Sequence, residues 1–200
     1  MDKLTKYKSI RDKSKTSEPF GDEKPDSSKL YFVVQKHRAT ALHYDFRLEY
    51  CGVMASWAIP KGPTLDPAVR RLAMQTEDHP LDYRHFEGTI PQGEYGGGEV
   101  IIWDSGMYIA EGEIAKGVRV KVKVKSEAEK VIEQGLKKGE IKFYLEGKRL
   151  KGSFALVKTK GFPPGKKNAW LLIKHRDKFV KEGFDAAEFT TSVVSDKKLV

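Results

Sequence analysis

The sequence contains a single cysteine, Cys51, among its 200 residues, and it has no long apolar run. One cysteine excludes an internal disulfide framework and a multi-cysteine zinc cluster, and it is compatible with a reducing compartment. No stretch approaches the roughly 18 apolar residues of a membrane-spanning helix. The basic N-terminus lacks the apolar segment and cleavage site of a secretory signal. These absences predict a soluble, cytoplasmic protein without a membrane partner.

Acidic residues are fewer than basic ones, 28 against 37, which gives a net charge of +9. Positive potential attracts polyanions, so nucleic acid is the leading candidate partner, and charge that only aids solubility is the alternative. The alternating run "VRVKVKVK" could follow a phosphate backbone or form the solvated outer face of a sheet.

Short strand-like runs separated by turn signals follow a polar N-terminal segment. We expect a flexible arm over 1–29 that is ordered where it docks on the active site. A β-barrel domain over 30–182 and a C-terminal tail over 183–200, frayed at its end, should follow. The density of short strands favours a compact, mostly β, closed barrel over a parallel sheet.

Glycines mark several expected turns. The connections "YCGV", "DSGM" and "EGKRLKG" place glycine where a tight hairpin needs it. "GEYGGG" lacks the lysine and the following helix of a nucleotide-binding loop, so a hairpin or bulge explains it better. One helix is predicted at "SEAEKVIEQGLKKG", with Ser126 and Glu129 at capping-box spacing and Gly135 or Gly139 to end it.

The stretch "QKHRATALHYDFRLE" alternates polar and apolar residues. If it is extended, His43, Asp45 and Arg47 share one face, while aromatic and aliphatic residues share the other. Imidazole and carboxylate groups suit divalent manganese, zinc or iron, so His37, His43 and Asp45 are candidate metal ligands. Structural histidines that only form hydrogen bonds are the alternative.

Cations close to these residues in sequence indicate a phosphate substrate. Arg47 continues the polar face, Lys61 lies in a rigid loop, and Arg71 opens the next strand. Guanidinium groups bind phosphate oxygens through a planar fork. Further along, His79 could act as an acid, base or phosphate donor, and the phenol of Tyr83 could donate a hydrogen bond.

Together these motifs resemble the 3′-phosphoesterase family, the end-healing modules found within bacterial DNA ligase D and as free-standing proteins. The resemblance rests on "QKHRATALHYDFRLE", "SWAIPKGP", "EDHPLDYRHFEGTIPQGEYGGGEVIIWDSG" and "WLLIKHRD". It implies a compact β-barrel with a small helical component. It also implies a manganese-dependent enzyme of DNA repair by end joining, with Zn²⁺ or Co²⁺ as alternative metals.

The implied substrate is a DNA primer-template that ends in a 3′ ribonucleotide or a 3′-phosphate. The enzyme would remove the ribonucleoside by phosphodiester cleavage and then remove the phosphate, leaving a 3′-hydroxyl. The metal ligands carried over by motif are His37, His43 and Asp45. The phosphate-binding residues carried over are Arg47, Lys61, Arg71 and His79, with His79 and Tyr83 supporting chiefly the phosphomonoesterase step.

The family also uses an N-terminal Arg-Asp pair and a following glutamate, which "SIRDKSKTSEP" supplies as Arg11, Asp12 and Glu18. The chain lacks a Lys-x-Asp-Gly nucleotidyltransferase motif, so we expect a separate DNA ligase and polymerase as partners. Two other functions fit the same residues. One is an iron-dependent oxygenase, because two histidines and a carboxylate also describe a facial triad. The other is a non-catalytic module that binds nucleic-acid ends.

Overall fold

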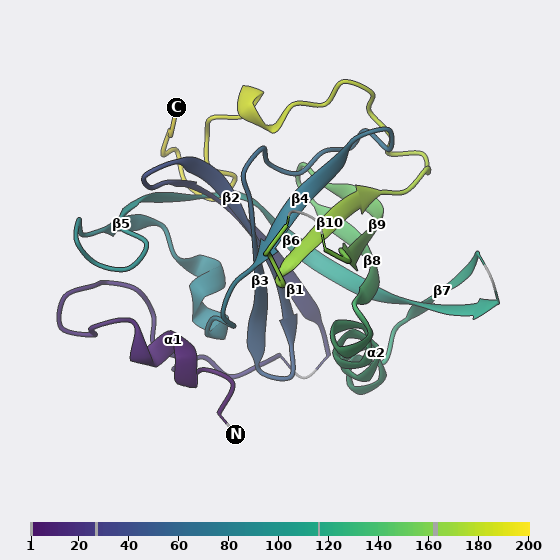
Figure 1. The fold of residues 1–200 in the computed structure, drawn as a ribbon, viewed down its shortest axis with the longest axis horizontal. Helices are drawn as coiled ribbons and strands as arrows, with labels where there is room; N and C mark the ends of the chain where they lie inside the picture. Colours follow the sequence, from purple (N-terminus) through teal and green to yellow (C-terminus); the bar gives the residue numbers. More distant parts are fainter. Residues whose placement is uncertain (1, 27, 116, 162–163) are drawn as a thin grey trace.

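The computed structural model describes residues 2–26, 28–115, 117–161 and 164–200, and an antiparallel β-barrel forms its centre (Figure 1). The barrel strands are β1 (Leu30–Arg38), β2 (Leu42–Tyr50), β3 (Val53–Ile59), β4 (Arg70–Gln75), β6 (Gly98–Ala115), β8 (Glu140–Gly147), β9 (Lys151–Lys158) and β10 (Ala169–Lys174). Their order is β1-β2-β3-β4-β10-β9-β8-β6, and β6 pairs with β1 to close the ring. The predicted mostly β, closed-barrel fold is confirmed.

Apolar side chains that alternate along the strands fill the barrel interior. On β2, Tyr44, Phe46 and Leu48 are buried inside, where Phe46 stacks on Phe143 of β8. Burial of such rings is the main favourable term in folding. Because successive strand residues point to opposite faces, the polar residues between them lie on the outer face of the barrel.

Two short strands lie outside the ring. β5 (Gly88–Ile90) and β7 (Val118–Val122) both pair with β6. The β6–β7 hairpin projects from the barrel (Figure 1). Two cations of its alternating run "VRVKVKVK" have partners within the protein. Arg119 pairs with Glu111, and Lys121 lies over the ring of Tyr144.

The predicted turns are correct in part. The hairpin at "YCGV" is confirmed, with positive φ at Cys51 and Gly52, and "GEYGGG" connects β5 and β6 as a hairpin. The hairpin expected at "DSGM" is wrong, because β6 runs unbroken through Gly106. A Cβ atom at Gly106 would collide with the backbone of Glu146 on β8, so this glycine permits close strand approach.

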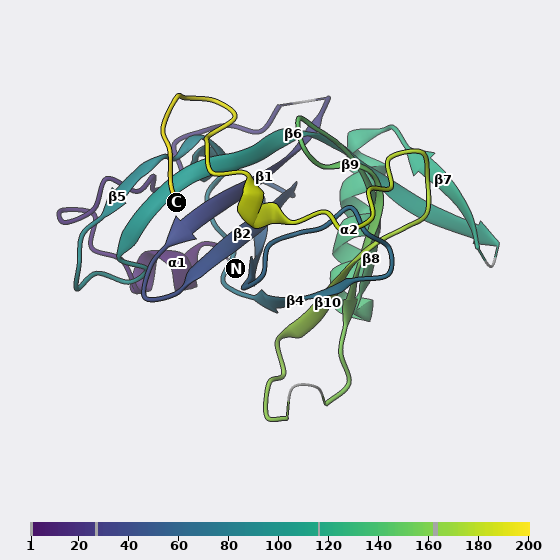
Figure 2. The same ribbon diagram turned by 90° about the horizontal axis from the view of Figure 1, so that it is seen from above.

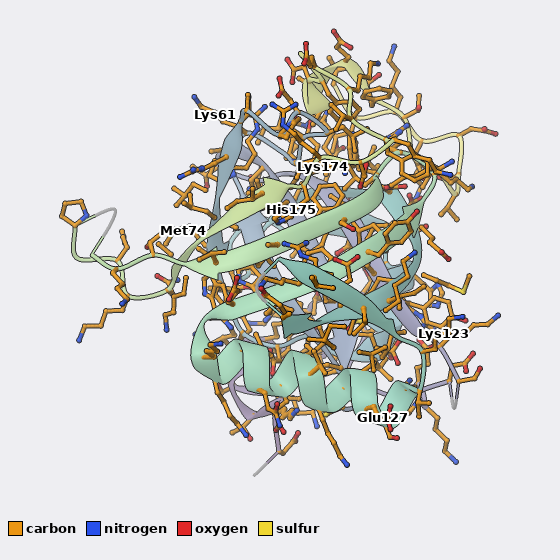
Figure 3. The ribbon with its side chains drawn as sticks, turned by 90° about the vertical axis from the view of Figure 1, so that its right-hand side faces the viewer. Lys61, Met74, Lys123, Glu127, Lys174 and His175 are labelled. Atoms are coloured by element: carbon orange, nitrogen blue, oxygen red, sulfur yellow. The ribbon has the colours of Figure 1, made fainter. Side chains whose placement is uncertain are left out.

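Helix α2 (Lys125–Lys138) packs against β6 and β8 beneath the strands in Figure 3. It ends at Gly139, which has a φ of 86°. The predicted capping box is wrong, because the helix begins before Ser126. Glu129 instead accepts a hydrogen bond from the backbone N of Cys51 at 2.9 Å. No helix in the described ranges is long and apolar enough to cross a membrane.

Both ends of the chain pack on the barrel. α1 (Thr5–Ser9) lies near the 3₁₀ helix η1 (Leu81–His85), and the C-terminal segment crosses the opposite side (Figure 1). Figure 2 shows the C-terminal 3₁₀ helix η2 (Ala186–Glu188) over β1 and β2. The expectation of a frayed tail is wrong, because Leu199 is buried and its carbonyl accepts a 2.8 Å hydrogen bond from Lys36 Nζ.

Candidate metal centre and phosphate site

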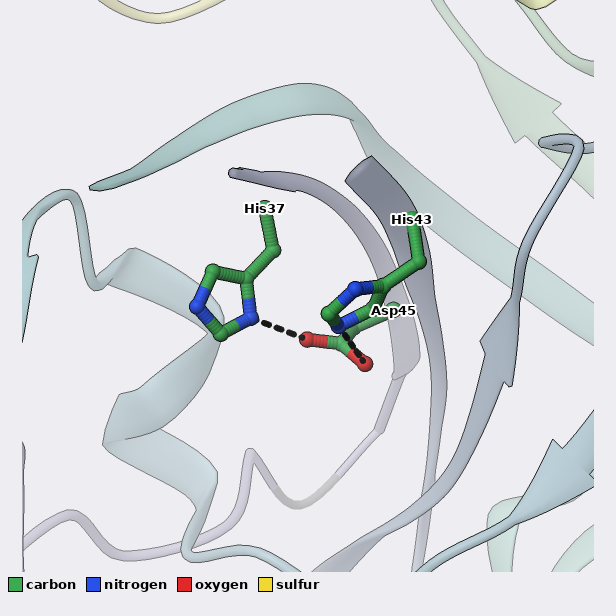
Figure 4. A group of neighbouring side chains, drawn as sticks. All are labelled: His37, His43 and Asp45. Carbon is green, nitrogen blue, oxygen red and sulfur yellow. Dashed lines mark ion pairs between the residues drawn. The ribbon is translucent and has the colours of Figure 1, made fainter. Parts of the chain in front are cut away.

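Three potential metal ligands meet on the outer face of the barrel (Figure 4). His37 on β1 lies directly opposite His43 on β2, and Asp45 follows two residues later on the same face of β2. Each residue offers one ligand atom, and these atoms lie within 4.8 Å of one another. Among the described parts of the chain, this is the one cluster of three or more His, Cys, Asp or Glu residues with such geometry.

Backbone carbonyls orient both imidazoles. His37 Nε2 lies 2.8 Å from the carbonyl oxygen of Gly96, and His43 Nδ1 lies 2.9 Å from that of Ala41. Because a carbonyl only accepts, these two nitrogens carry the hydrogens and donate. The remaining nitrogens, Nδ1 of His37 and Nε2 of His43, lie 3.4 and 3.7 Å from carboxylate oxygens of Asp45. Metal-binding histidines are typically held in this way, so the donor set fits a divalent transition ion.

Arg47 contacts the cluster through Asp45 and is only 2% exposed. Its guanidinium donates to Gln35 Oε1 at 2.8 Å, Ser56 Oγ at 2.9 Å and Asp45 Oδ2 at 3.2 Å. Burial alone would raise the pKa of Asp45, but the charge of the Arg47 guanidinium opposes it, and the pKa lies below its usual value. Asp45 is therefore an ionised carboxylate, as a metal ligand must be.

The buried imidazole of His79 lines another side of the cavity. Its Nδ1 lies 2.9 Å from the carbonyl oxygen of Glu77 and therefore donates, while Arg11 Nη2 lies 3.3 Å from its Nε2. Burial and the charges of Arg47 and Arg11 hold the pKa of His79 well below its usual value. The ring is neutral, and Nε2 is its acceptor. Glu77 therefore orients His79 through its backbone carbonyl.

The N-terminal arm supplies a wall of this cavity. Arg11 Nε pairs with Glu18 Oε1 at 2.9 Å, and the Tyr83 hydroxyl donates to the same oxygen at 2.9 Å. Burial raises the pKa of Tyr83 well above its usual value, so the phenol keeps the proton that it directs at Glu18. Tyr7 is fully buried, contacts His79 edge-on and lies 3.9 Å below the Arg11 guanidinium. The arm thus holds the His79 side of the cavity in place.

Most of the predicted site residues line or border one cavity of about 260 Å³. Those lining it are His37, His43, Asp45, Arg47, His79, Tyr83 and Arg11. Lys61 and Arg71 are not among them. They line a different cavity of about 440 Å³ together with Tyr44, which faces away from His43 and Asp45 on β2. Asp12 is exposed and bonds locally to Ser14.

Sequence reasoning missed Gln35, Ser56, Tyr7 and Tyr95 as members or neighbours of the site. Gln35 could have been found, because it shares a strand face with His37 at period two. It donates to two backbone carbonyls at η1, at 3.0 and 2.9 Å, and so ties β1 to that turn. Tyr95 lines the cavity from a loop, and Tyr7 of the arm packs behind it against His79 and Arg11. No local pattern specifies the paths of these two segments.

Residues 35–158 match the family model of the DNA ligase D 3′-phosphoesterase domain. The chain belongs to this family. The matched region contains the candidate metal ligands and Arg47, whereas Arg11 and Glu18 precede it. The membership predicted from the motifs is confirmed.

Relatives of this 3′-phosphoesterase domain include the multifunctional non-homologous end joining protein LigD of Pseudomonas aeruginosa. That protein is 43% identical over 202 residues, which covers 98% of this chain and 22% of the relative. LigD of Mycolicibacterium smegmatis is 44% identical over 177 residues, covering 88% of this chain and 21% of the relative. LigD of Mycobacterium tuberculosis is 45% identical over 182 residues, covering 90% of this chain and 20% of the relative. The chain spans about a fifth of the length of these curated relatives.

We expect Glu18→Ala to loosen the N-terminal arm of this 3′-phosphoesterase domain. The substitution leaves the buried Tyr83 hydroxyl without its acceptor and removes one carboxylate from Arg11, a loss of about 1 to 3 kcal/mol for each unsatisfied group. Amide hydrogen exchange over residues 2–20 should therefore rise. Asp12→Ala is the matched control, because Asp12 is exposed. Equal exchange in the two variants would contradict the anchoring role of Glu18.

Proposed function

We propose that this chain is a metal-dependent enzyme that heals DNA 3′ ends. It would cleave the phosphodiester bond that joins a 3′-terminal ribonucleoside, leaving a 3′-phosphate, and then remove that phosphate to leave a 3′-hydroxyl. One observation carries the proposal: two imidazoles and a carboxylate are oriented as metal ligands, and a buried guanidinium donates a hydrogen bond to that carboxylate. A metal next to an arginine is an arrangement suited to a phosphate group.

His37 Nδ1, His43 Nε2 and Asp45 would hold the ion, which we propose to be Mn²⁺, with Zn²⁺ or Co²⁺ as alternatives. A divalent ion bound there would neutralise charge on the phosphate oxygens. Three protein ligands leave coordination positions open for a substrate, as in catalytic sites. The buried Arg47 beside them favours a phosphate ester as substrate, because its guanidinium can bind phosphate oxygens through a planar fork. An oxygenase would instead need an organic cosubstrate.

Arg47 would bind and orient the scissile phosphate. Its hydrogen bonds to Gln35, Ser56 and Asp45 hold the guanidinium before any substrate arrives, so little reorganisation is needed during the reaction. Lys61 and Arg71 line a separate cavity and would contact a neighbouring phosphate of the same strand.

His79 would serve chiefly the phosphomonoesterase step. Its Nε2 is an acceptor at rest, and an arriving phosphate dianion would favour uptake of a proton there. The resulting imidazolium donates to the phosphate, and a terminal monoester, which is more anionic than a diester, depends more on that donor. Tyr83 would support the same step by holding Glu18 and the arm against His79.

The relatives' names refer to non-homologous end joining, and we propose that this chain heals DNA ends in the same process. A DNA ligase and a polymerase would then act on the 3′-hydroxyl that it exposes. Incubation of the protein with Mn²⁺ and an end-labelled primer-template that ends in one ribonucleotide tests the proposal. Sequential appearance of the 3′-phosphate and 3′-hydroxyl products is expected. An uncut primer would contradict the enzymatic function and favour a module that only binds ends.

The His79→Ala variant should convert the ribonucleotide-ended primer to its 3′-phosphate form and then stall. Loss of one such donor typically lowers a rate by about 10²- to 10³-fold, here on the monoester step. Asp45→Ala should block both steps, because it removes a metal ligand. Gel resolution of the labelled products over time checks both outcomes. The assignment of His79 chiefly to the phosphomonoesterase step is wrong if His79→Ala leaves the starting primer uncut or forms the 3′-hydroxyl product at the wild-type rate.

Gly96→Ala should weaken metal binding by about 10- to 100-fold, the usual effect of disturbing a group that orients a metal ligand. Gly96 has a φ of +79°, so a side chain strains the backbone whose carbonyl orients His37. Gly93→Ala is the matched control, since its φ is +93° in the same loop and its Cβ would meet no atom within 4 Å. Calorimetric titration with Mn²⁺ compares the two, and equal affinities would count against the orienting role of Gly96.

A further inference from the structure

Tyr95 places an exposed aromatic ring in the wall of the candidate active cavity. It is 51% exposed, and it is the one exposed Phe, Tyr or Trp among the residues that the structure describes. The ring lines the same cavity as His37, Asp45 and Arg47. An aromatic face beside a cationic, phosphate-binding site is the feature with which proteins stack unpaired nucleobases.

The loop that carries Tyr95 is tied to a candidate metal ligand. Gly93 and Gly96 lie on either side of Tyr95 with φ values of +93° and +79°, and a hydrogen bond from Gly97 N to the Glu94 carbonyl at 3.0 Å closes the turn that contains Tyr95. The carbonyl of Gly96, the next residue, accepts the 2.8 Å hydrogen bond from His37 Nε2. The backbone of Gly96 therefore links the Tyr95 ring directly to His37 and fixes the position of the ring relative to the metal cluster.

Arg11 lies on one side of the Tyr95 ring, with its Cζ 5.2 Å from the ring centroid. The same guanidinium is fixed by Glu18 and Glu77, at 2.9 and 3.0 Å. One side of the ring thus rests on an anchored cation, while about half of the residue stays exposed. A planar base placed on the exposed side would extend this stack and cover apolar surface that is now in water.

We propose that Tyr95 stacks on the nucleobase of the 3′-terminal nucleotide, the part of the substrate that leaves in the diester step. This inference rests on the proposed function and adds to it a binding subsite for the departing nucleoside. A ribonucleotide-ended primer carries a base beyond the scissile phosphate, whereas the 3′-phosphate intermediate carries none. Tyr95 is therefore a positioning residue that distinguishes the two substrates. Every base has a π face, so all four terminal nucleotides are accommodated.

Kinetics on two primers with Mn²⁺ test the proposal. Tyr95→Ala should lower kcat/KM for the ribonucleotide-ended primer by about 5- to 150-fold relative to the 3′-phosphate-ended primer, as base stacking typically contributes about 1 to 3 kcal/mol. Tyr95→Phe keeps the ring and should retain the wild-type ratio, while Tyr95→Leu keeps apolar bulk without the ring and should behave like Tyr95→Ala. Val118→Ala, at a position 50% exposed on β7, is the control for loss of an exposed apolar side chain.

A primer that ends in an abasic ribonucleotide isolates the stacking itself. Without a base, Tyr95→Ala and Tyr95→Phe should cleave this primer with equal kcat/KM. Two results would overturn the stacking role while leaving the proposed function intact. One is that Tyr95→Ala lowers kcat/KM by the same factor on the ribonucleotide-ended and 3′-phosphate-ended primers. The other is that Tyr95→Ala and Tyr95→Phe still differ in kcat/KM on the abasic primer. Absence of turnover by the wild-type protein on all primers would overturn the proposed function and the subsite together.

Discussion

The alternation of side chains along β2 is the constraint on which the rest of this structure depends. Packing of Tyr44, Phe46 and Leu48 into the closed barrel forces His43, Asp45 and Arg47 onto its outer face. A one-residue slip of the strand would exchange the two sets and destroy the core and the candidate site together. The hydrophobic effect therefore fixes the positions of the polar side chains at the metal cluster. A rigid sheet is the kind of support that such a site requires.

The polar outer face is itself buried, and this explains why the N-terminal arm and η1 cover it. Asp45, Arg47, Glu77 and Glu18 are each less than 10% exposed. Charges removed from water need partners, because an unpaired buried charge is strongly destabilising. Arg11 of the arm forms ion pairs with both Glu18 and Glu77. Arg47 forms an ion pair with Asp45. The pairing that makes these charges tolerable also holds the candidate catalytic groups in fixed positions.

Sequence predicted the features that depend on residues close along the chain. Period two placed His43 and Asp45 on one face, and the density of strands predicted a closed barrel. Features that depend on a distant neighbour were not predictable. Gly106 resembles a turn residue in the sequence, because its close approach to β8 is visible only in the structure. Leu199 resembles part of a frayed end, because the hydrogen bond from Lys36 to its carbonyl joins residues far apart in the chain. The chain also gives no local sign that Lys61 and Arg71 line a different cavity from His37.

The central claim is that His37, His43 and Asp45 form a metal centre on the barrel surface. An anomalous difference map from a crystal soaked in Mn²⁺ tests it most directly. One peak is predicted about 2.0 to 2.4 Å from His37 Nδ1, His43 Nε2 and an Asp45 oxygen, with Gly96 and Ala41 still accepting from the opposite ring nitrogens. A peak at another site, or an ion bound through His37 Nε2 or His43 Nδ1, would contradict the claim.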